Sequence, residues 1–144
     1  MSSYLDFHYC TYAGDSNKTK FFEKIIKEIG NNYYLDGVLL REELIEREND
    51  GCSIIAEGLA MPHIVSRNIT RSVIVVVNIP RSFIKWYQDM TIDTAIILLV
   101  RENNNESELD EVRSIIQKLS IGKNCKLLRV MSVEEIKEML LLGK

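Results

Sequence analysis

The amino-acid sequence predicts an α/β fold, in which helices cover a β-sheet. Residues 71–79 and 92–100 are nearly continuous apolar runs rich in β-branched side chains, a pattern typical of strands buried on both faces. Amphipathic helical patterns precede and follow these two runs. Buried strands combined with such helices indicate a sheet layered by helices.

Two helices are expected before the first long strand. Residues 20–29 carry apolar side chains at positions 21, 22, 25, 26 and 29, the stripe of an amphipathic helix. Residues 35–48 predict a second helix, with Asp36 as its N-cap. Short strands are expected between this helix and the first long strand.

The region after the second long strand predicts a loop followed by a third helix. The acidic, asparagine-rich residues 101–108 are the longest loop candidate. Residues 107–119 have a helical stripe, and Ser107 and Asp110 form a capping-box pattern at its start.

The C-terminal part predicts a short strand and a closing helix. Residues 126–130, "KLLRV", are expected to form the strand. Residues 132–142 are expected to form the helix, with a capping box from Ser132 to Glu135.

Length and composition indicate one cytoplasmic domain spanning residues 1–144. A chain of 144 residues buries roughly two thirds of its unfolded surface without needing a disulfide or a metal ion. The net charge of −3 argues against direct binding to nucleic acid or to an anionic membrane. No apolar run approaches the ~20 residues that span a bilayer, and residues 1–10 lack the pattern of a signal peptide.

The three cysteines predict reduced thiols. Cys10, Cys52 and Cys125 are odd in number and lack CxxC spacing. A nucleophilic pair of Cys52 and His63 is a weaker alternative. No metal site is expected, because the two histidines are far apart and no cysteines or carboxylates cluster at ligand spacing.

The segment "EGLAMPHIVSRN", residues 57–68, contains the first candidate functional residue. Pro62 fixes its own φ and restricts the residue before it, so the backbone leading to His63 is stiff. Gly58 permits an unusual backbone turn just upstream. These features are compatible with a structural histidine and with a nucleophile presented at the surface.

Arg47 and Ser53 are the candidate partners of His63. Arg47 lies near the end of the second predicted helix, within one helix–loop–strand step of His63. Its guanidinium could hold a phosphoryl or carboxylate group, or it could belong to a solvated helix end. Ser53 could add a hydroxyl donor, or it could be an ordinary loop serine.

These residues resemble the signature of enzyme IIA domains of the fructose/mannitol class, from the bacterial phosphoenolpyruvate-dependent sugar phosphotransferase system. The usual form runs Arg-Glu, three variable residues, Ser-Thr, then a glycine-rich step into Gly-Ile-Ala-Ile-Pro-His. This chain has Arg47-Glu48, Cys52-Ser53 and "GLAMPH", residues 58–63, at the same spacing. The order of helices and strands around the motif extends the resemblance over almost the whole chain.

The resemblance implies a single-domain sandwich, with a mixed β-sheet flanked by helices on both faces. It implies a phosphotransferase that needs no cofactor and no metal. His63 would accept a phosphoryl group from phosphorylated HPr and pass it to a cysteine of an enzyme IIB domain during sugar uptake, while Arg47 neutralises phosphoryl charge. The partners would be proteins, namely phosphorylated HPr and the enzyme IIB domain, and the domain could also dock to a membrane sugar permease complex.

Three positions depart from the family pattern. Ser-Thr is replaced by Cys52-Ser53, and the residue after the histidine, often glycine, is Ile64. Many members carry a second histidine at the place where this chain has Glu108. Its carboxylate could orient the Nδ1–H of His63, could repel the phosphoryl group, or could simply be a glutamate favoured by the helix dipole. The other histidine, His8, matches nothing in the motif and is interpreted as structural or incidental.

The departure at Glu108 leaves a second functional hypothesis. Enzyme IIA-like domains also occur attached to sugar-operon transcriptional regulators, where phosphorylation of the histidine is a signal. Phosphorylation of His63 would then control a transcriptional regulator or another partner. A plain interaction domain without phosphotransfer would require the motif match to be accidental or decayed.

Overall fold

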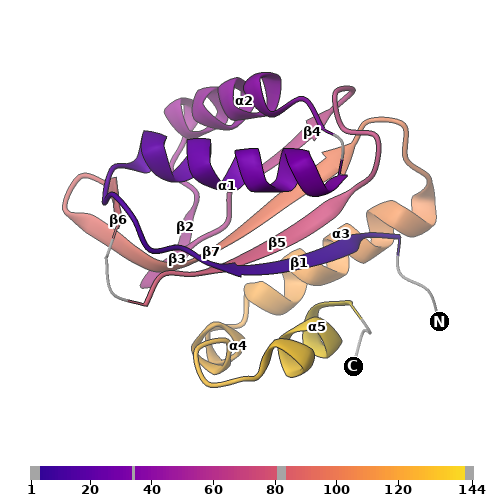
Figure 1. Cartoon of the computed structure of the whole chain (residues 1–144). Coiled ribbons are helices and arrows are strands. Elements are labelled where there is room, and N and C mark those ends of the chain that lie inside the picture. Colours follow the sequence, from indigo (N-terminus) through magenta and orange to yellow (C-terminus); the bar gives the residue numbers. More distant parts are fainter. Residues whose placement is uncertain (1–3, 34, 81–83, 142–144) are drawn as a thin grey trace.

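The structure is a computed structural model that describes residues 4–33, 35–80 and 84–141. Its core is a mixed sheet with the strand order β1-β5-β7-β3-β2, in which β4 and β6 also pair with β7 (Figure 1). The strands are β1 (Asp6–Thr11), β2 (Ile54–Ala56), β3 (Gly58–Ala60), β4 (His63–Ser66), β5 (Val73–Asn78), β6 (Ile84–Tyr87) and β7 (Met90–Arg101). The helices are α1 (Lys18–Tyr33), α2 (Gly37–Asp50), α3 (Glu106–Leu119), α4 (Gly122–Leu127) and α5 (Val133–Leu141).

The two long apolar runs form the centre of the sheet, as predicted. β5 pairs with β7 antiparallel, while β3 and β4 pair with β7 parallel. Successive residues of a strand point to opposite faces, so Val75 and Val77 enter one hydrophobic core and Ile74 and Val76 enter the other. Because both faces are buried, neither run shows the alternation of a half-exposed strand.

Helices cover both faces of the sheet, which confirms the predicted α/β sandwich. α1 and α2 lie together over one face, and α3, α4 and α5 lie over the other (Figure 1). The apolar stripe of α1 is fully buried. The two hydrophobic cores therefore lie on opposite faces of one sheet. β4 is a strand of this sheet and α2 packs against one of its faces, so the sheet positions both elements.

The sequence-based expectations about elements were in part wrong or incomplete. Residues 126–130 do not form a strand: α4 runs through Leu127, and turns follow it. The strand β1 was not anticipated. The N-cap of α3 is Asn105, whose side chain accepts from the Glu108 N–H at 2.8 Å, so the helix begins before the expected cap at Ser107.

Two other expected caps are present. Ser132 and Glu135 exchange reciprocal hydrogen bonds of 2.9 and 3.2 Å before α5, as a capping box requires. Asp36 caps α2, with its Oδ1 accepting from the Leu39 N–H at 3.2 Å.

We expect Asp36→Ala to lower the free energy of unfolding by about 1 kcal/mol, because the first turn of α2 loses an acceptor for one of its free N–H groups. Asp36→Asn should preserve most of the stability, since asparagine caps equally well. Urea denaturation of the two variants and the wild type measures the difference. Equal stabilities for the alanine and asparagine variants would contradict a role for the cap.

In the part of the chain that the structure describes, none of the helices combines the length and the apolar character that crossing a membrane requires.

Candidate functional site

His63 is the first residue of β4, directly after the buried Pro62. The backbone on both sides of the proline is tied to the sheet: the Met61 N–H donates to the Ser53 carbonyl at 2.8 Å, and the Leu98 N–H donates to the Pro62 carbonyl at 3.0 Å. With the φ of Pro62 also restricted, the position of the His63 backbone is well defined.

The imidazole of His63 is half-buried, and its Nδ1 lies 3.3 Å from the Met61 carbonyl oxygen. A carbonyl oxygen can only accept a hydrogen bond, so Nδ1 carries the proton in this contact. The neutral ring then has its lone pair on Nε2. The backbone thus selects the tautomer whose Nε2 can act as a nucleophile.

Arg47 lies in the last turn of α2, and the structure brings it to the same surface pocket as His63. The pocket has a volume of about 430 Å³. It is lined by Glu43, Glu46, Arg47, Asp50, His63, Ile64 and Val65. The Arg47 Nη1 donates to the Gly51 carbonyl at 3.2 Å, and within the described residues the other guanidinium donors have no hydrogen-bond partner.

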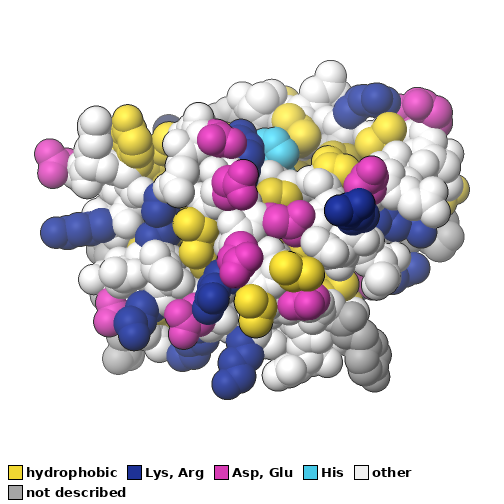
Figure 2. Space-filling model, turned by 90° about the horizontal axis from the view of Figure 1, so that it is seen from above, with side chains coloured by type: hydrophobic (Ala, Val, Ile, Leu, Met, Phe, Trp, Pro, Cys, Tyr) yellow, Lys and Arg dark blue, Asp and Glu magenta, His cyan; other side chains and the backbone are white. Residues whose placement is uncertain are grey.

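The pocket lining holds three carboxylates and one Lys or Arg side chain, that of Arg47. Glu43 accepts the Ser66 hydroxyl through both oxygens, at 2.8 and 2.9 Å, whereas Glu46 and Asp50 are exposed. Asp and Glu side chains also gather on the face formed by α1 and α2 (Figure 2). Such a rim favours a positively charged docking partner.

The structure does not bring Ser53 to the pocket lining. Ser53 is buried, and its Oγ accepts from the indole N–H of Trp86 at 3.0 Å. The Ser53 carbonyl accepts from the Met61 N–H, and the Met61 carbonyl in turn accepts from the Nδ1–H of His63. Ser53 therefore contacts the backbone that supports the histidine, and the described residues show no contact between its hydroxyl and the imidazole.

Glu48 is a residue of the site whose role the sequence reasoning did not assign. Its carboxylate is buried and lies 3.6 Å from the Lys18 Nζ, yet it accepts no hydrogen bond within residues 4–33, 35–80 and 84–141. Lys18 also donates to the Trp86 carbonyl at 2.7 Å. This ion pair joins the start of α1 to the end of α2 that carries Arg47. The signal in the sequence was the Arg-Glu pair itself.

The structure corrects the suggestion that Glu108 orients His63. Glu108 is fully buried in the first turn of α3, and its Oε1 accepts from Arg101 at 2.8 and 2.9 Å. Its Oε2 accepts a short hydrogen bond from the Ser72 hydroxyl. Neither oxygen contacts His63 in the described structure, and the Nδ1 of His63 has the Met61 carbonyl as its partner.

The cysteines are free thiols in the described residues. Cys52 is exposed and neither lines the pocket nor bonds to His63 among those residues. The alternative of a Cys52–His63 nucleophilic pair therefore has no geometric support.

Comparison with known proteins identifies the family. Residues 12–142 match the model of the family "Phosphoenolpyruvate-dependent sugar phosphotransferase system, EIIA 2". The chain belongs to this family. EIIA domains are phosphotransfer carriers, and the match covers the elements that hold Arg47 and His63. A search of curated proteins gave no significant match.

Solved structures share the EIIA fold with this chain. The nitrogen regulatory protein IIA-Ntr from Neisseria meningitidis is 22% identical with a TM-score of 0.73, and the alignment covers 92% of each chain. The mannitol enzyme IIA from Escherichia coli is 16% identical with a TM-score of 0.60, covering 90% of this chain and 94% of that one. A complex of the Escherichia coli mannitol enzymes IIA and phosphorylated IIB gives 14% identity and a TM-score of 0.59, covering 90% and 97%. At these identities the likeness concerns the fold alone.

Proposed function

We propose that this EIIA domain is a histidine phosphocarrier that accepts a phosphoryl group from phosphorylated HPr on His63 and passes it to a cysteine of an enzyme IIB domain during sugar uptake. The observation that carries the proposal is the shared pocket of His63 and Arg47, in which the Nδ1–H of His63 is bound to the Met61 carbonyl. A nucleophile with a selected tautomer and an adjacent guanidinium are what phosphoryl transfer requires of a protein.

The proposed reaction needs no proton transfer at His63. The Nε2 lone pair attacks phosphorus, the N–P bond on the donor histidine breaks, and the donor ring recovers its lone pair. The His63 ring becomes cationic, because Nδ1 keeps its proton, and the hydrogen bond to the Met61 carbonyl strengthens as the charge develops. In the second step a thiolate of the IIB partner attacks phosphorus, and Nε2 leaves with its electron pair.

Arg47 supplies charge stabilisation in this scheme. The phosphoryl oxygens carry negative charge in the transition state, and a planar guanidinium can bind two of them at once. The exposed carboxylates of the rim act on the protein partner by attracting basic side chains. An IIB partner is supported by the Escherichia coli complex, which contains a IIA protein and phosphorylated IIB.

The test is phosphorylation by phosphoenolpyruvate, enzyme I and HPr, followed by intact mass measurement. We expect the wild type to gain one acid-labile phosphoryl group and His63→Ala to gain none. His8, the other histidine of the chain, remains in this variant, so a label that survives the substitution would assign the site to another residue. Absence of label on the folded wild type would refute the phosphocarrier proposal.

A second candidate is a regulatory EIIA domain, in which phosphorylated His63 controls a transcriptional regulator or another partner. It is favoured by Glu108, which stands where many members carry a second histidine and is committed to Arg101 and Ser72. The two candidates separate when IIB proteins are added to the phosphorylated domain. Loss of the label to a IIB cysteine supports transport, whereas a label retained against every IIB protein supports regulation.

A further inference from the structure

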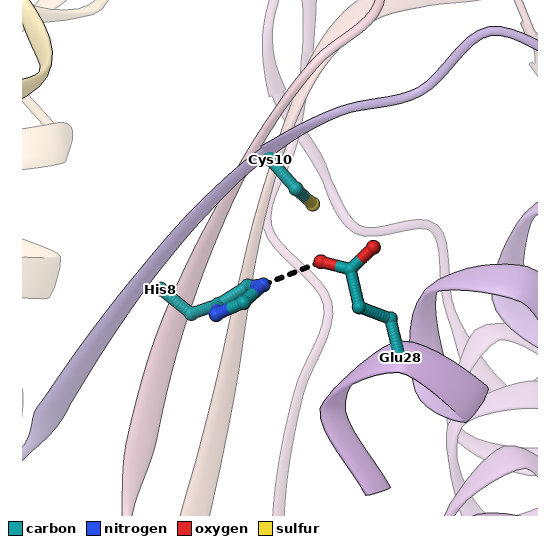
Figure 3. A group of neighbouring side chains, drawn as sticks. All are labelled: His8, Cys10 and Glu28. Atoms are coloured by element: carbon teal, nitrogen blue, oxygen red, sulfur yellow. Dashed lines mark hydrogen bonds and ion pairs between the residues drawn. The ribbon is translucent and has the colours of Figure 1, made fainter. Parts of the chain in front are cut away.

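Three potential metal ligands lie together on the α1 side of the sheet, away from His63. His8 and Cys10 are two residues apart on β1 and so share a face, and Glu28 comes from α1, which crosses that face (Figure 3). One ligand atom from each side chain lies within 4.8 Å of the other two. This cluster was not expected from the sequence, since β1 was not predicted and Glu28 is distant along the chain from His8 and Cys10.

The hydrogen bonds around His8 direct its Nε2 into the cluster. The Tyr33 hydroxyl donates to the Phe7 carbonyl at 3.5 Å, and its oxygen lies 3.4 Å from the Nδ1 of His8. In the structure Nε2 donates its proton to the Glu28 carboxylate. A bound cation would take the place of this proton, and Nδ1 would then donate to the Tyr33 oxygen. A ligating histidine commonly has such a partner on its other ring nitrogen.

We propose that His8, Cys10 and Glu28 bind a divalent transition-metal ion of the zinc type. Imidazole nitrogen, thiolate and carboxylate are the ligands that Zn²⁺ takes, and bond lengths of about 2.0–2.3 Å place tetrahedral ligand atoms about 3.3–3.8 Å apart. The Nε2 of His8 and the carboxylate of Glu28 are 2.5 Å apart, so they must separate slightly. The Glu28 side chain is 46% exposed and has room to do so.

The charges of the three ligands match a divalent cation. The ion replaces the Cys10 thiol proton, so that one thiolate and one carboxylate balance its two positive charges. Three protein ligands leave the fourth position of a tetrahedral ion for water. The site is one ligand short of a closed structural zinc site.

A role for Cys10 as a free nucleophile is the competing interpretation, and its surroundings oppose it. Burial, followed by the negative charge of Glu28, raises the pKa of the Cys10 thiol to about 12. Without a cation the group is a neutral thiol, which is a poor nucleophile.

The cluster is also remote from the phosphotransfer pocket: β5 and β7 separate β1 from β4, a distance of about 14 Å at ordinary strand spacing.

The test uses the chain of residues 1–144 without a histidine tag, reduced by a phosphine and titrated with Co²⁺ as a spectroscopic probe. We expect one equivalent to bind with a thiolate-to-cobalt charge-transfer band, and Zn²⁺ to displace it. Cys10→Ser should abolish the band, while the matched control Cys52→Ser, at an exposed thiol outside the cluster, should keep it. His8→Gln and Glu28→Gln should each weaken binding at least tenfold, and Tyr33→Phe about tenfold.

Circular dichroism of each variant shows whether it is folded, and Glu28→Gln should leave the fold intact because the side chain is exposed on α1. The proposal is overturned if the folded wild type gives no charge-transfer band, if the band persists in Cys10→Ser, or if neither His8→Gln nor Glu28→Gln changes the affinity. Phosphorylation of His63 is an independent measurement, so failure at one site does not imply failure at the other.

Discussion

Replacing Glu108 by leucine is expected to lower the free energy of unfolding by about 3–5 kcal/mol, the usual effect of removing one partner of a buried ion pair. The side chain of Glu108 is fully buried, whereas that of Arg101 is 35% exposed. Partial hydration of Arg101 therefore favours the lower end of this range. The Ser72 hydroxyl, also buried, loses its acceptor as well. Chemical denaturation monitored by circular dichroism measures the change.

Two matched variants show whether the lost charge pairing is responsible. Glu106→Leu replaces an exposed glutamate on the same helix, whose contact with Arg113 is 3.7 Å long, and should change stability by less than about 0.5 kcal/mol. The double variant Arg101→Met with Glu108→Leu should be more stable than Glu108→Leu alone, because it removes the unpaired charge. A double variant with the same or lower stability would show that another effect of the Glu108 substitution dominates.

The sheet and its helix layers were predictable because their signals are local in the sequence. The runs that became β5 and β7 are buried on both faces, and α1 has a regular apolar stripe. β1 lacks such a signal. Among the described strands it pairs with β5 alone, and it is mostly half-buried, with polar residues interspersed. Neither periodicity nor a continuous apolar run therefore marks it.

The strand expected at residues 126–130 was wrong because the composition of this segment favours a strand while its buried positions have helical spacing. The short apolar sequence "KLLRV" suits a strand by composition, but Cys125 and Leu128, three positions apart, are the residues buried there. That spacing belongs to a helical turn. Five residues are too few for composition to decide between a helix and a strand.

The candidate site was predictable where its residues are close in sequence. Arg47 and His63 are joined by one helix–loop–strand step, and they line one pocket. The surroundings of Ser53 and Glu108 depend on contacts with Trp86, Arg101 and Ser72, which follow from the packing of distant segments. Spacing along the chain does not reveal such contacts, and the same holds for the cluster of His8, Cys10 and Glu28.

Under the proposed function, Arg47→Ala is expected to slow phosphoryl transfer to His63 by about 10²–10³-fold, the usual effect of removing one group that stabilises transition-state charge. Arg47→Lys should recover part of the rate, because it restores the charge but not the planar pair of donors. Rapid-quench measurement of a single turnover from phosphorylated HPr gives both rates. The fold should survive, since the side chain of Arg47 makes one hydrogen bond within the described residues, to the Gly51 carbonyl.

Arg41→Ala is the matched control for Arg47. Arg41 lies on the same helix, outside the His63 pocket, and pairs at 3.7 Å with the exposed Glu23. Arg41→Ala removes one positive charge from α2, as Arg47→Ala does. A general electrostatic effect on HPr docking would therefore slow both variants equally and would diminish in high salt. A loss confined to Arg47→Ala, and persisting at saturating HPr, would instead place its guanidinium on the phosphoryl group. Equal rates for Arg47→Ala and the wild type would remove Arg47 from the mechanism and leave charge stabilisation to the donor protein.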